Sequence, residues 1–270
     1  MRGFRSRFEF TFVLAVLTAV PLLLLNPPLA LLPWVAFTLL CLTGPFVQRL
    51  SFFLPIARRG YGDRAEISLT FDDGPDAETT PGLLKLLARY GVKGAFFVIG
   101  EKAAANPGLI REILKEGHEI GNHSDTHDVF LMLRGRKKIA VDIQSCQETL
   151  ARFSIIPKTF RPPIGITNPH LRPILKSLGM SCVGFSCRPL DFGNRRIAEM
   201  KDKVLNKIKA GDILLLHDCR PQGANTPKQW LKQVESILSG LQEKQLQPVP
   251  LSRLIERPVM ERLEVCNDGF

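Results

Sequence analysis

Hydrophobic positions divide the chain into two parts with different patterns. Two apolar runs without internal charge, at about 10–25 and 29–47, lie near the N-terminus and are separated by Asn26, Pro27 and Pro28. From Glu66 onward, short apolar runs alternate with stretches in which apolar residues recur every three or four positions. The first pattern is typical of membrane-spanning helices, and the second of alternating strands and amphipathic helices.

The two N-terminal runs predict a transmembrane helical hairpin, because each is close to the length that crosses a hydrocarbon core of about 30 Å. Both flanks of the pair are basic, with Arg2, Arg5 and Arg7 before it and Arg49, Arg58 and Arg59 after it. By the positive-inside rule, both ends of the hairpin face the cytoplasm. We therefore expect residues 1–59 to be a membrane anchor and residues 60–270 to form a cytoplasm-facing domain.

Two other interpretations of the apolar runs stay open. The basic start followed by a short apolar stretch also fits a signal peptide or a single anchor, which would place the domain outside the cytoplasm, although no clear A-x-A cleavage site follows. Both runs could instead be core helices of a soluble protein. Their lack of a polar face argues against that interpretation.

The second part of the chain has an α/β rhythm. We expect strands at 66–71, 93–100, 118–123, 158–163, 181–186, 212–217 and near 248–252. We expect helices at 81–91, 107–116, 136–152, 169–178, 196–209 and 226–241. About seven strand–helix pairs predict a distorted (β/α) barrel related to the TIM type, in which the chemistry sits on loops at the carboxyl ends of the strands.

Charge and cysteine content narrow the classes of partner. The net charge of +10 suits nucleic acid, anionic lipid or an acidic substrate. Because no nucleic-acid-binding motif is present, we expect a membrane surface or a phosphate-bearing lipid and no nucleic acid; the oligomeric state is not predicted. Six cysteines without a C-x-x-C pair indicate no disulfide framework.

Asp72 and Asp73 are the first candidates for chemistry, since they follow an apolar strand and precede Gly74 and Pro75, which enforce a turn. One carboxylate can bind a metal while the other takes a proton from water, as metal-assisted hydrolysis requires. An ordinary Asp-Gly turn is the structural alternative.

His123 and His127 lie four residues apart, after another predicted strand. Two imidazoles at this spacing can converge on one cation if the loop curves, and Asp73 could supply a third ligand. A set of two His and one carboxylate suits Zn²⁺, and Co²⁺, Mn²⁺ or Ni²⁺ would also fit. Without comparable neighbours, His118 and His170 are expected to be structural or exposed.

Three further strand ends carry candidate residues. Arg161 could pair with Asp72, and the backbone N–H of Ile164, held by the neighbouring prolines, could face a developing oxyanion. Asp191 could favour the protonated form of His217 and so equip it as a general acid. The structural alternatives are a rigid loop for Arg161 and Ile164, a solvated loop charge for Asp191, and an ordinary strand-end histidine for His217.

In this order, the motifs TFDDGP, HSDTH, RPPIG, LDF and LLLHD resemble those of polysaccharide deacetylases with a NodB homology domain, carbohydrate esterase family four. The resemblance runs from about Ser68 to Ile255. It implies a distorted barrel and hydrolytic N-deacetylation of sugars. By motif, it implies Asp72 as base, Asp73, His123 and His127 as metal ligands, Arg161 as the residue that orients the base, Ile164 as oxyanion donor, Asp191 with His217 as the acid, and Leu215 and Phe192 as walls of the acyl pocket.

This sequence departs from the family pattern at three positions. Ile164 stands where an aromatic residue is usual, Phe192 where Trp or Tyr is usual, and Arg188 where Asp is frequent. A cation at Arg188 favours an anionic or phosphate-linked sugar. Alternatives to a polysaccharide deacetylase are therefore a deformylase or deacetylase of a lipid-linked sugar at the cytoplasmic face of the membrane, and a catalytically silent sugar-binding membrane protein.

Overall fold

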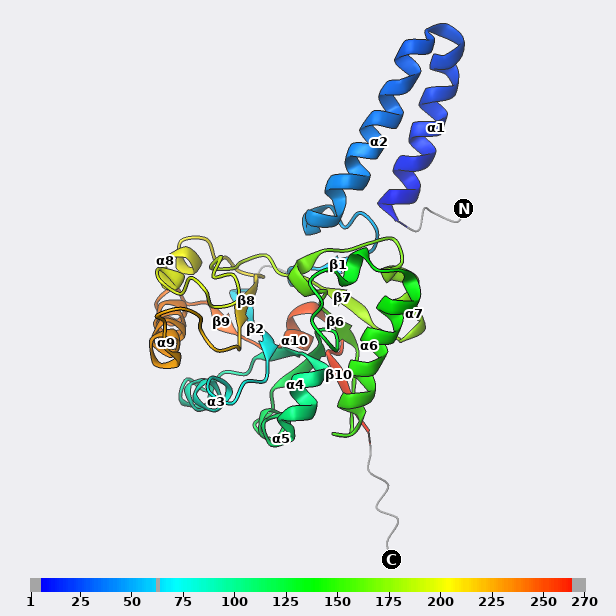
Figure 1. Ribbon diagram of the computed structural model, residues 1–270. Coiled ribbons are helices and arrows are strands. Elements are labelled where there is room, and N and C mark those ends of the chain that lie inside the picture. Colours follow the sequence, from blue (N-terminus) through cyan, green and yellow to red (C-terminus); the bar gives the residue numbers. More distant parts are fainter. Residues whose placement is uncertain (1–5, 62–63, 264–270) are drawn as a thin grey trace, which may run out of the picture.

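The computed structural model describes residues 6–61 and 64–263, and its centre is a curled, eight-stranded sheet in which every pairing is parallel (Figure 1). The strand order is β1-β7-β6-β4-β3-β2-β8, and β9 pairs with the start of β2. The strands are β1 (Ile56–Ala57), β2 (Glu66–Gly74), β3 (Ala95–Val98), β4 (Glu119–Asn122), β6 (Thr159–Phe160), β7 (Ser181–Val183), β8 (Ile213–His217) and β9 (Gln247–Pro248).

The sheet closes into a barrel only in part. The segment after β7 reaches β8, where the backbone N–H groups of Ser186 and Cys187 donate to the Ile213 carbonyl and the Leu215 N–H donates to the Cys187 carbonyl. These bonds make one isolated bridge in place of a regular strand pair, so the strand predicted at 181–186 ends at Val183. The expected α/β class and distorted barrel are confirmed.

Side chains alternate across β2 between two environments. Ile67, Leu69 and Phe71 pack outward in a core shared with the surrounding helices. Successive residues of a strand point to opposite faces, so Thr70 and Asp72 point into the barrel. Both are buried there, and both bind the same arginine. The alternation in sequence thus places polar groups inside the barrel at its carboxyl end.

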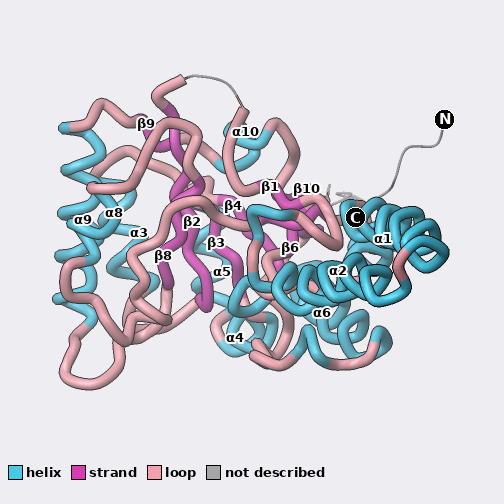
Figure 2. Tube along the Cα trace, turned by 90° about the horizontal axis from the view of Figure 1, so that it is seen from above, coloured by secondary structure: helices cyan, strands magenta, loops and turns pink. Residues whose placement is uncertain are grey.

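Helices cover the outside of the sheet (Figure 2). They are α3 (Thr80–Arg89), α4 (Gly100–Ala105), α5 (Pro107–Lys115), α6 (Arg136–Ala151), α7 (Leu171–Ser177), α8 (Met200–Leu205), α9 (Pro227–Glu243) and α10 (Leu251–Ile255). Sequence analysis did not predict α4 or α10, and α8 is shorter than the predicted helix at 196–209. The last predicted strand is limited to β9, because Pro248 and Pro250 have no N–H to extend a ladder. A small antiparallel pair, β5 (Ile155–Pro157) with β10 (Met260–Arg262), was also not predicted.

Two antiparallel apolar helices project from one side of the barrel, α1 (Arg7–Leu25) and α2 (Leu31–Thr43) (Figure 1). A short turn, η1 (Pro27–Ala30), joins them at the expected Pro-Pro pair. The stretches Arg7–Leu25 and Pro27–Phe46 are each long and apolar enough to cross a membrane. Most of their large apolar side chains are exposed, so the core of the barrel does not account for this apolar surface.

The segment that joins the hairpin to the barrel packs against the barrel. We call residues 44–50 the hairpin foot; it comprises η2 (Gly44–Phe46), Val47 and η3 (Gln48–Leu50). The Pro45 carbonyl accepts a hydrogen bond from the Thr167 N–H, and Phe52 lies in a buried cluster with residues of α6 and α7. Strand β1, which sequence analysis grouped with the anchor, pairs with β7.

Candidate functional site

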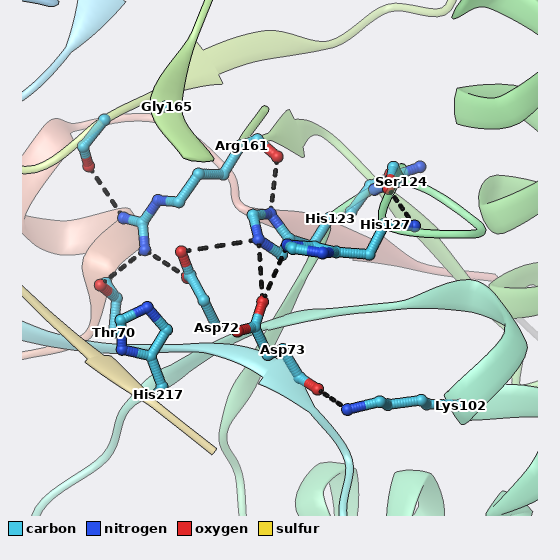
Figure 3. A network of polar contacts seen from close by, with 12 residues as sticks. Thr70, Asp72, Asp73, Lys102, His123, Ser124, His127, Arg161, Gly165 and His217 are labelled. Atoms are coloured by element: carbon cyan, nitrogen blue, oxygen red, sulfur yellow. Dashed lines mark hydrogen bonds and ion pairs between the residues drawn. The ribbon is translucent and has the colours of Figure 1, made fainter. Parts of the chain in front are cut away.

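The polar side chains at the carboxyl ends of β2, β4, β6 and β8 gather in one cleft of about 800 Å³ (Figure 3). Every candidate residue from the sequence lines it: Asp72, Asp73, His123, His127, Arg161, Ile164, Asp191, Phe192, Leu215 and His217. Strands far apart in the sequence bring these residues together, because parallel strands share one carboxyl edge.

A bulge in β2 allows two consecutive aspartates to face the same site. The pairing of β2 with β3 shifts register between Asp72 and Gly74, and Asp73 has a left-handed φ of 69°. In a regular strand, neighbouring side chains would point to opposite faces. The extra residue of a bulge re-aims its side chain, so Asp73 turns toward the histidines while Asp72 stays inside the barrel.

A tight turn after β4 brings His123 and His127 together. The Asn122 side-chain oxygen accepts from the Ser124 N–H at 2.8 Å, and the Ser124 hydroxyl accepts from the His127 N–H at 3.0 Å. Ser124 and His127 both have left-handed backbones. The two imidazole rings consequently lie with their centroids 5.1 Å apart.

Asp73, His123 and His127 present one oxygen and two nitrogen atoms to a common point. Asp73 Oδ1 lies 3.3 Å from His123 Nε2 and 3.1 Å from His127 Nε2, and the three ligand atoms lie within 4.8 Å of one another. Although burial alone would raise it, the pKa of Asp73 lies well below its usual value because both histidines hydrogen-bond the carboxylate. Burial lowers the pKa of His123, but Asp72 and Asp73 outweigh this and raise it. The cluster therefore favours a positive charge at its centre.

The other nitrogen of His123 is positioned as in a metal site. Its Nδ1 lies 2.7 Å from the Arg161 carbonyl oxygen. Because a carbonyl oxygen only accepts hydrogen bonds, Nδ1 carries a hydrogen, so loss of the proton on Nε2 would leave a lone pair there for a ligand bond. The donor set and this hydrogen bond both fit a divalent cation of the Zn²⁺ type.

Asp72 is held by a buried arginine. Arg161 Nη1 donates to Asp72 Oδ1 at 2.6 Å and to the Thr70 hydroxyl at 2.8 Å, and Nη2 donates to the Gly184 carbonyl. The guanidinium also stacks on Phe97 at 4.0 Å. One oxygen of the Asp72 carboxylate is thus fixed, while Oδ2 faces the metal-ligand cluster, 3.8 Å from His123 Nε2.

His217 lies on β8, next to Asp72 on β2, and beside an acidic partner of its own. Its Nδ1 lies 2.7 Å from Asp191 Oδ2, and Asp191 is buried. Burial alone would lower the pKa of His217, but the hydrogen bond and charge of Asp191, followed by the charges of Asp73 and Asp72, raise it to about 9. These contacts therefore favour the protonated form of His217.

The remaining candidates line the open part of the cleft. Ile164 has a left-handed φ of 50° between Pro163 and Gly165, and across the described ranges its N–H has no hydrogen-bond partner. Ile164 is 56% exposed, Phe192 is 59% exposed, and Leu215 is buried. Ile164, Leu215 and Phe192 therefore line the same cleft.

Other residues support the site but were not identified from the sequence. Thr70 accepts from Arg161, and the Lys102 ammonium donates to the Asp73 backbone carbonyl at 2.7 Å. The Asn194 amide donates to the carbonyls of His217 and Cys219. Thr70 was visible in the TFDDGP motif, whereas nothing in the local sequence identified Lys102 or Asn194.

The two histidines expected to be structural or exposed lie outside the cleft. His118 is buried, its Nδ1 accepts from the Gly94 N–H, and burial followed by the charge of Lys93 lowers its pKa to about 4. His170 is exposed at the start of α7. The described cysteines are free, and Cys266 lies outside the described residues.

Comparison with known proteins agrees with this geometry. The family model for polysaccharide deacetylases matches residues 59–183. The chain is 35% identical over 191 residues to a peptidoglycan-N-acetylglucosamine deacetylase of Bacillus cereus, which covers 70% of this chain and 87% of that protein. It is 33% identical over 205 residues to a chitooligosaccharide deacetylase of Sinorhizobium fredii, which covers 72% of this chain and 92% of that protein.

A solved structure shares the fold over nearly its whole length. It is a peptidoglycan N-acetylglucosamine deacetylase in complex with 4-naphthalen-1-yl-N-oxidanyl-benzamide, with a TM-score of 0.69 and 30% identity, covering 76% of this chain and 94% of that one. The chain therefore belongs to the polysaccharide deacetylase family and is a hydrolase that acts on the C–N amide bonds of sugars.

Proposed function

We propose that the protein is a metal-dependent N-deacetylase of an N-acetylated sugar, with Asp72 as general base and His217 as general acid. The observation that carries this proposal is the pairing of the two residues across adjacent strands, Asp72 on β2 with His217 on β8, beside one cluster of metal-ligand type. A group that takes a proton and a group that gives one are what amide hydrolysis needs.

Asp73, His123 and His127 would hold the metal, for which Zn²⁺ is the first choice and Co²⁺, Mn²⁺ or Ni²⁺ are alternatives. A bound divalent cation supplies Lewis acidity that polarises the acyl carbonyl and lowers the pKa of water. The three ligands orient one another through their short contacts, and the Arg161 carbonyl keeps His123 in the required tautomer.

Asp72 takes the proton from the attacking water. Its Oδ1 is occupied by Arg161, which prevents rotation of the carboxylate, and Oδ2 faces the cluster and is the basic atom. Arg161 thus acts through Asp72 and is a positioning residue.

His217 gives a proton to the departing amine. Because Nδ1 is engaged by Asp191, the proton transferred is the one on Nε2. The Ile164 N–H stabilises the developing oxyanion, and the apolar side chains of Leu215 and Phe192 form the walls for the acyl methyl group.

The hairpin supports a membrane location. We propose that α1 and α2 span a bilayer and that the barrel faces the cytoplasm, because basic residues flank both ends of the apolar stretch. The contacts of the hairpin foot with the barrel then hold the catalytic domain close to the membrane surface.

The experiment that tests the proposed roles is release of acetate from an N-acetylglucosamine oligomer by the purified full-length protein. We expect Asp72→Asn and His217→Ala each to lower kcat by about 10² to 10⁴. Arg111→Gln, which changes an exposed cation on α5 that stacks on Phe153, is the control. Near-normal rates in Asp72→Asn or His217→Ala would overturn the assignment of base and acid.

A further inference from the structure

We infer that the substrate is an N-acylated sugar joined through phosphate to a membrane lipid, bound with its phosphate at Arg188 and its lipid toward the hairpin foot. This inference rests on the proposed function, since it names the substrate of the same site. Three independent features of the cleft support it: a direct link to the hairpin foot, an unpaired cation and an exposed apolar rim.

The wall of the cleft is attached to the hairpin foot through Gln48. The Gln48 amide donates to the Gly165 carbonyl at 3.2 Å, and its oxygen accepts from the Phe185 N–H at 3.4 Å. Gly165 and Phe185 both line the cleft. Since Gln48 follows the second apolar stretch by only two residues, the cleft opens next to the point where the chain would leave a bilayer.

Arg188 is a cation in the cleft without an anionic partner. Its guanidinium stacks on Phe185 at 5.2 Å, and within the part of the chain that the structure describes it has no hydrogen bond or ion pair. The other cations of the cleft are engaged: Arg161 by Asp72, Arg195 by Gln222, Arg220 by Glu78 and Lys102 by the Asp73 carbonyl. A planar guanidinium with free donors suits a phosphate group.

Arg188 and the hairpin foot share one neighbour. Phe185 carries the Arg188 guanidinium on its ring, and its backbone N–H binds Gln48. A ligand phosphate at Arg188 therefore lies on the side of the cleft that faces the foot. A neutral sugar polymer has no charge that could bind to this cation. A sugar joined to a lipid through phosphate carries its negative charge at the end of the sugar that faces the membrane.

Exposed apolar side chains border the same side of the cleft. Ile164 and Leu190 line it and are 56% and 38% exposed, and Ile164 adjoins Gly165, which binds Gln48. On the foot, Phe46 and Val47 are also exposed, and Val47 precedes Gln48. The contact between foot and cleft thus joins two apolar surfaces, along which the first carbons of a lipid can pack.

A cluster of arginines at the base of the hairpin fits the same orientation. Burial lowers the pKa of Arg58, and the charges of Arg49 and Arg59 lower it further, whereas Asp212, which pairs with Arg59 at 3.0 Å, raises it. Basic residues next to a spanning segment attract anionic lipid headgroups. They would hold this face of the barrel against the bilayer surface.

The experiment compares three substrates that carry the same N-acetylglucosamine. Full-length, metal-loaded protein in phosphatidylcholine nanodiscs is given the polyprenyl-phosphate-linked sugar, soluble N-acetylglucosamine 1-phosphate or neutral N-acetylchitotetraose, and acetate release is measured. We expect kcat/KM to be highest for the lipid-linked sugar and lowest for the neutral tetramer. In Arg188→Gln, the ratio of kcat/KM for the phosphate-bearing substrates to that for the tetramer should fall about tenfold. Arg188→Lys should keep part of the ratio, and Arg111→Gln all of it.

Each other outcome contradicts a defined part of the inference. If the neutral tetramer reacts at least as fast as the lipid-linked sugar, or if Arg188→Gln leaves the ratio unchanged, the phosphate assignment is wrong. If the soluble 1-phosphate equals the lipid-linked sugar, phosphate recognition stands and the lipid is not recognised. If none of the three substrates is hydrolysed, the proposed function itself fails.

Discussion

Arg161 crosses the interior of the barrel from the end of β6 to Asp72 at the end of β2, where Nη1 lies 2.6 Å from Oδ1. Both side chains are almost completely buried, so each charge depends on the other for solvation. The arginine also donates to Thr70 and Gly184, which satisfies more of its N–H groups. This pair connects the stability of the barrel with the orientation of the proposed base.

Removal of Arg161 should therefore affect both stability and activity. Arg161→Met leaves the Asp72 carboxylate buried without its cation, and we expect a loss of about 3–5 kcal/mol in the free energy of unfolding. Urea unfolding of the detergent-solubilised protein, followed by fluorescence, measures it, because Trp230 on α9 is fully buried in the core between the helices and the sheet. The double variant Arg161→Met with Asp72→Asn should recover part of the loss. If the losses in unfolding free energy of the two single variants simply add up in the double variant, the two residues are not coupled.

The pH dependence of the reaction should report the partnership of His217 and Asp191. The folded-state pKa of His217 is raised to about 9, so the acid stays protonated at neutral pH and kcat/KM falls as the pH rises through this value. Asp191→Asn removes the negative charge that raises the pKa of His217 most. The fall of kcat/KM at alkaline pH, the alkaline limb of the profile, should therefore move to lower pH. Asp202→Asn, an exposed substitution on α8, should leave the limb in place. An alkaline limb that is the same in Asp191→Asn and wild type would show that His217 is not the acid.

The size of the acyl group should be controlled by Leu215. This side chain lines the cleft from β8, the strand that also carries His217, and it is nearly buried. Leu215→Ala removes side-chain volume and so enlarges the apolar pocket. We expect the ratio of N-propionyl to N-acetyl hydrolysis to rise by about tenfold, since one methylene in an apolar pocket is worth about 1–3 kcal/mol. The measurement is kcat/KM for the two substrates. An unchanged ratio would place the acyl group elsewhere in the cleft.

The side of the membrane on which the barrel lies can be measured directly. A reporter that works only in the cytoplasm should be active when it is fused after Phe270, because basic residues flank both ends of the hairpin. The same reporter fused after Asn26, in the turn between the two apolar stretches, should report the opposite side. Equal results for both fusions would contradict two spans.

The sequence predicted the regular part of the fold and the members of the site for one physical reason. Strands with alternating or continuous apolar residues end in polar motifs, and a parallel sheet brings those ends together. The sequence alone therefore assigns Asp72, Arg161 and His217 to one edge of the sheet, and all three line the cleft there. Their distances depend on strand order and on the curl of the sheet, which no local pattern encodes.

The features that the sequence did not predict depend on contacts between distant segments. Strand β1 has two residues, and it is a strand only because Cys182 and Val183 lie beside it. The orientation of Asp73 comes from a bulge against β3. Gln48 has no distinctive local context, yet it binds two residues more than a hundred positions away. Tertiary packing decides such cases over local propensity.

The metal content of the purified protein tests the central claim most directly. We expect elemental analysis to find one equivalent of a divalent transition metal in the full-length wild type, and little in His123→Ala or His127→Ala. Acetate release should stop on treatment with a chelator and return when Zn²⁺ or Co²⁺ is added back. Full acetate release by metal-free wild type, or by His123→Ala, would contradict hydrolysis at a site built on Asp73, His123 and His127.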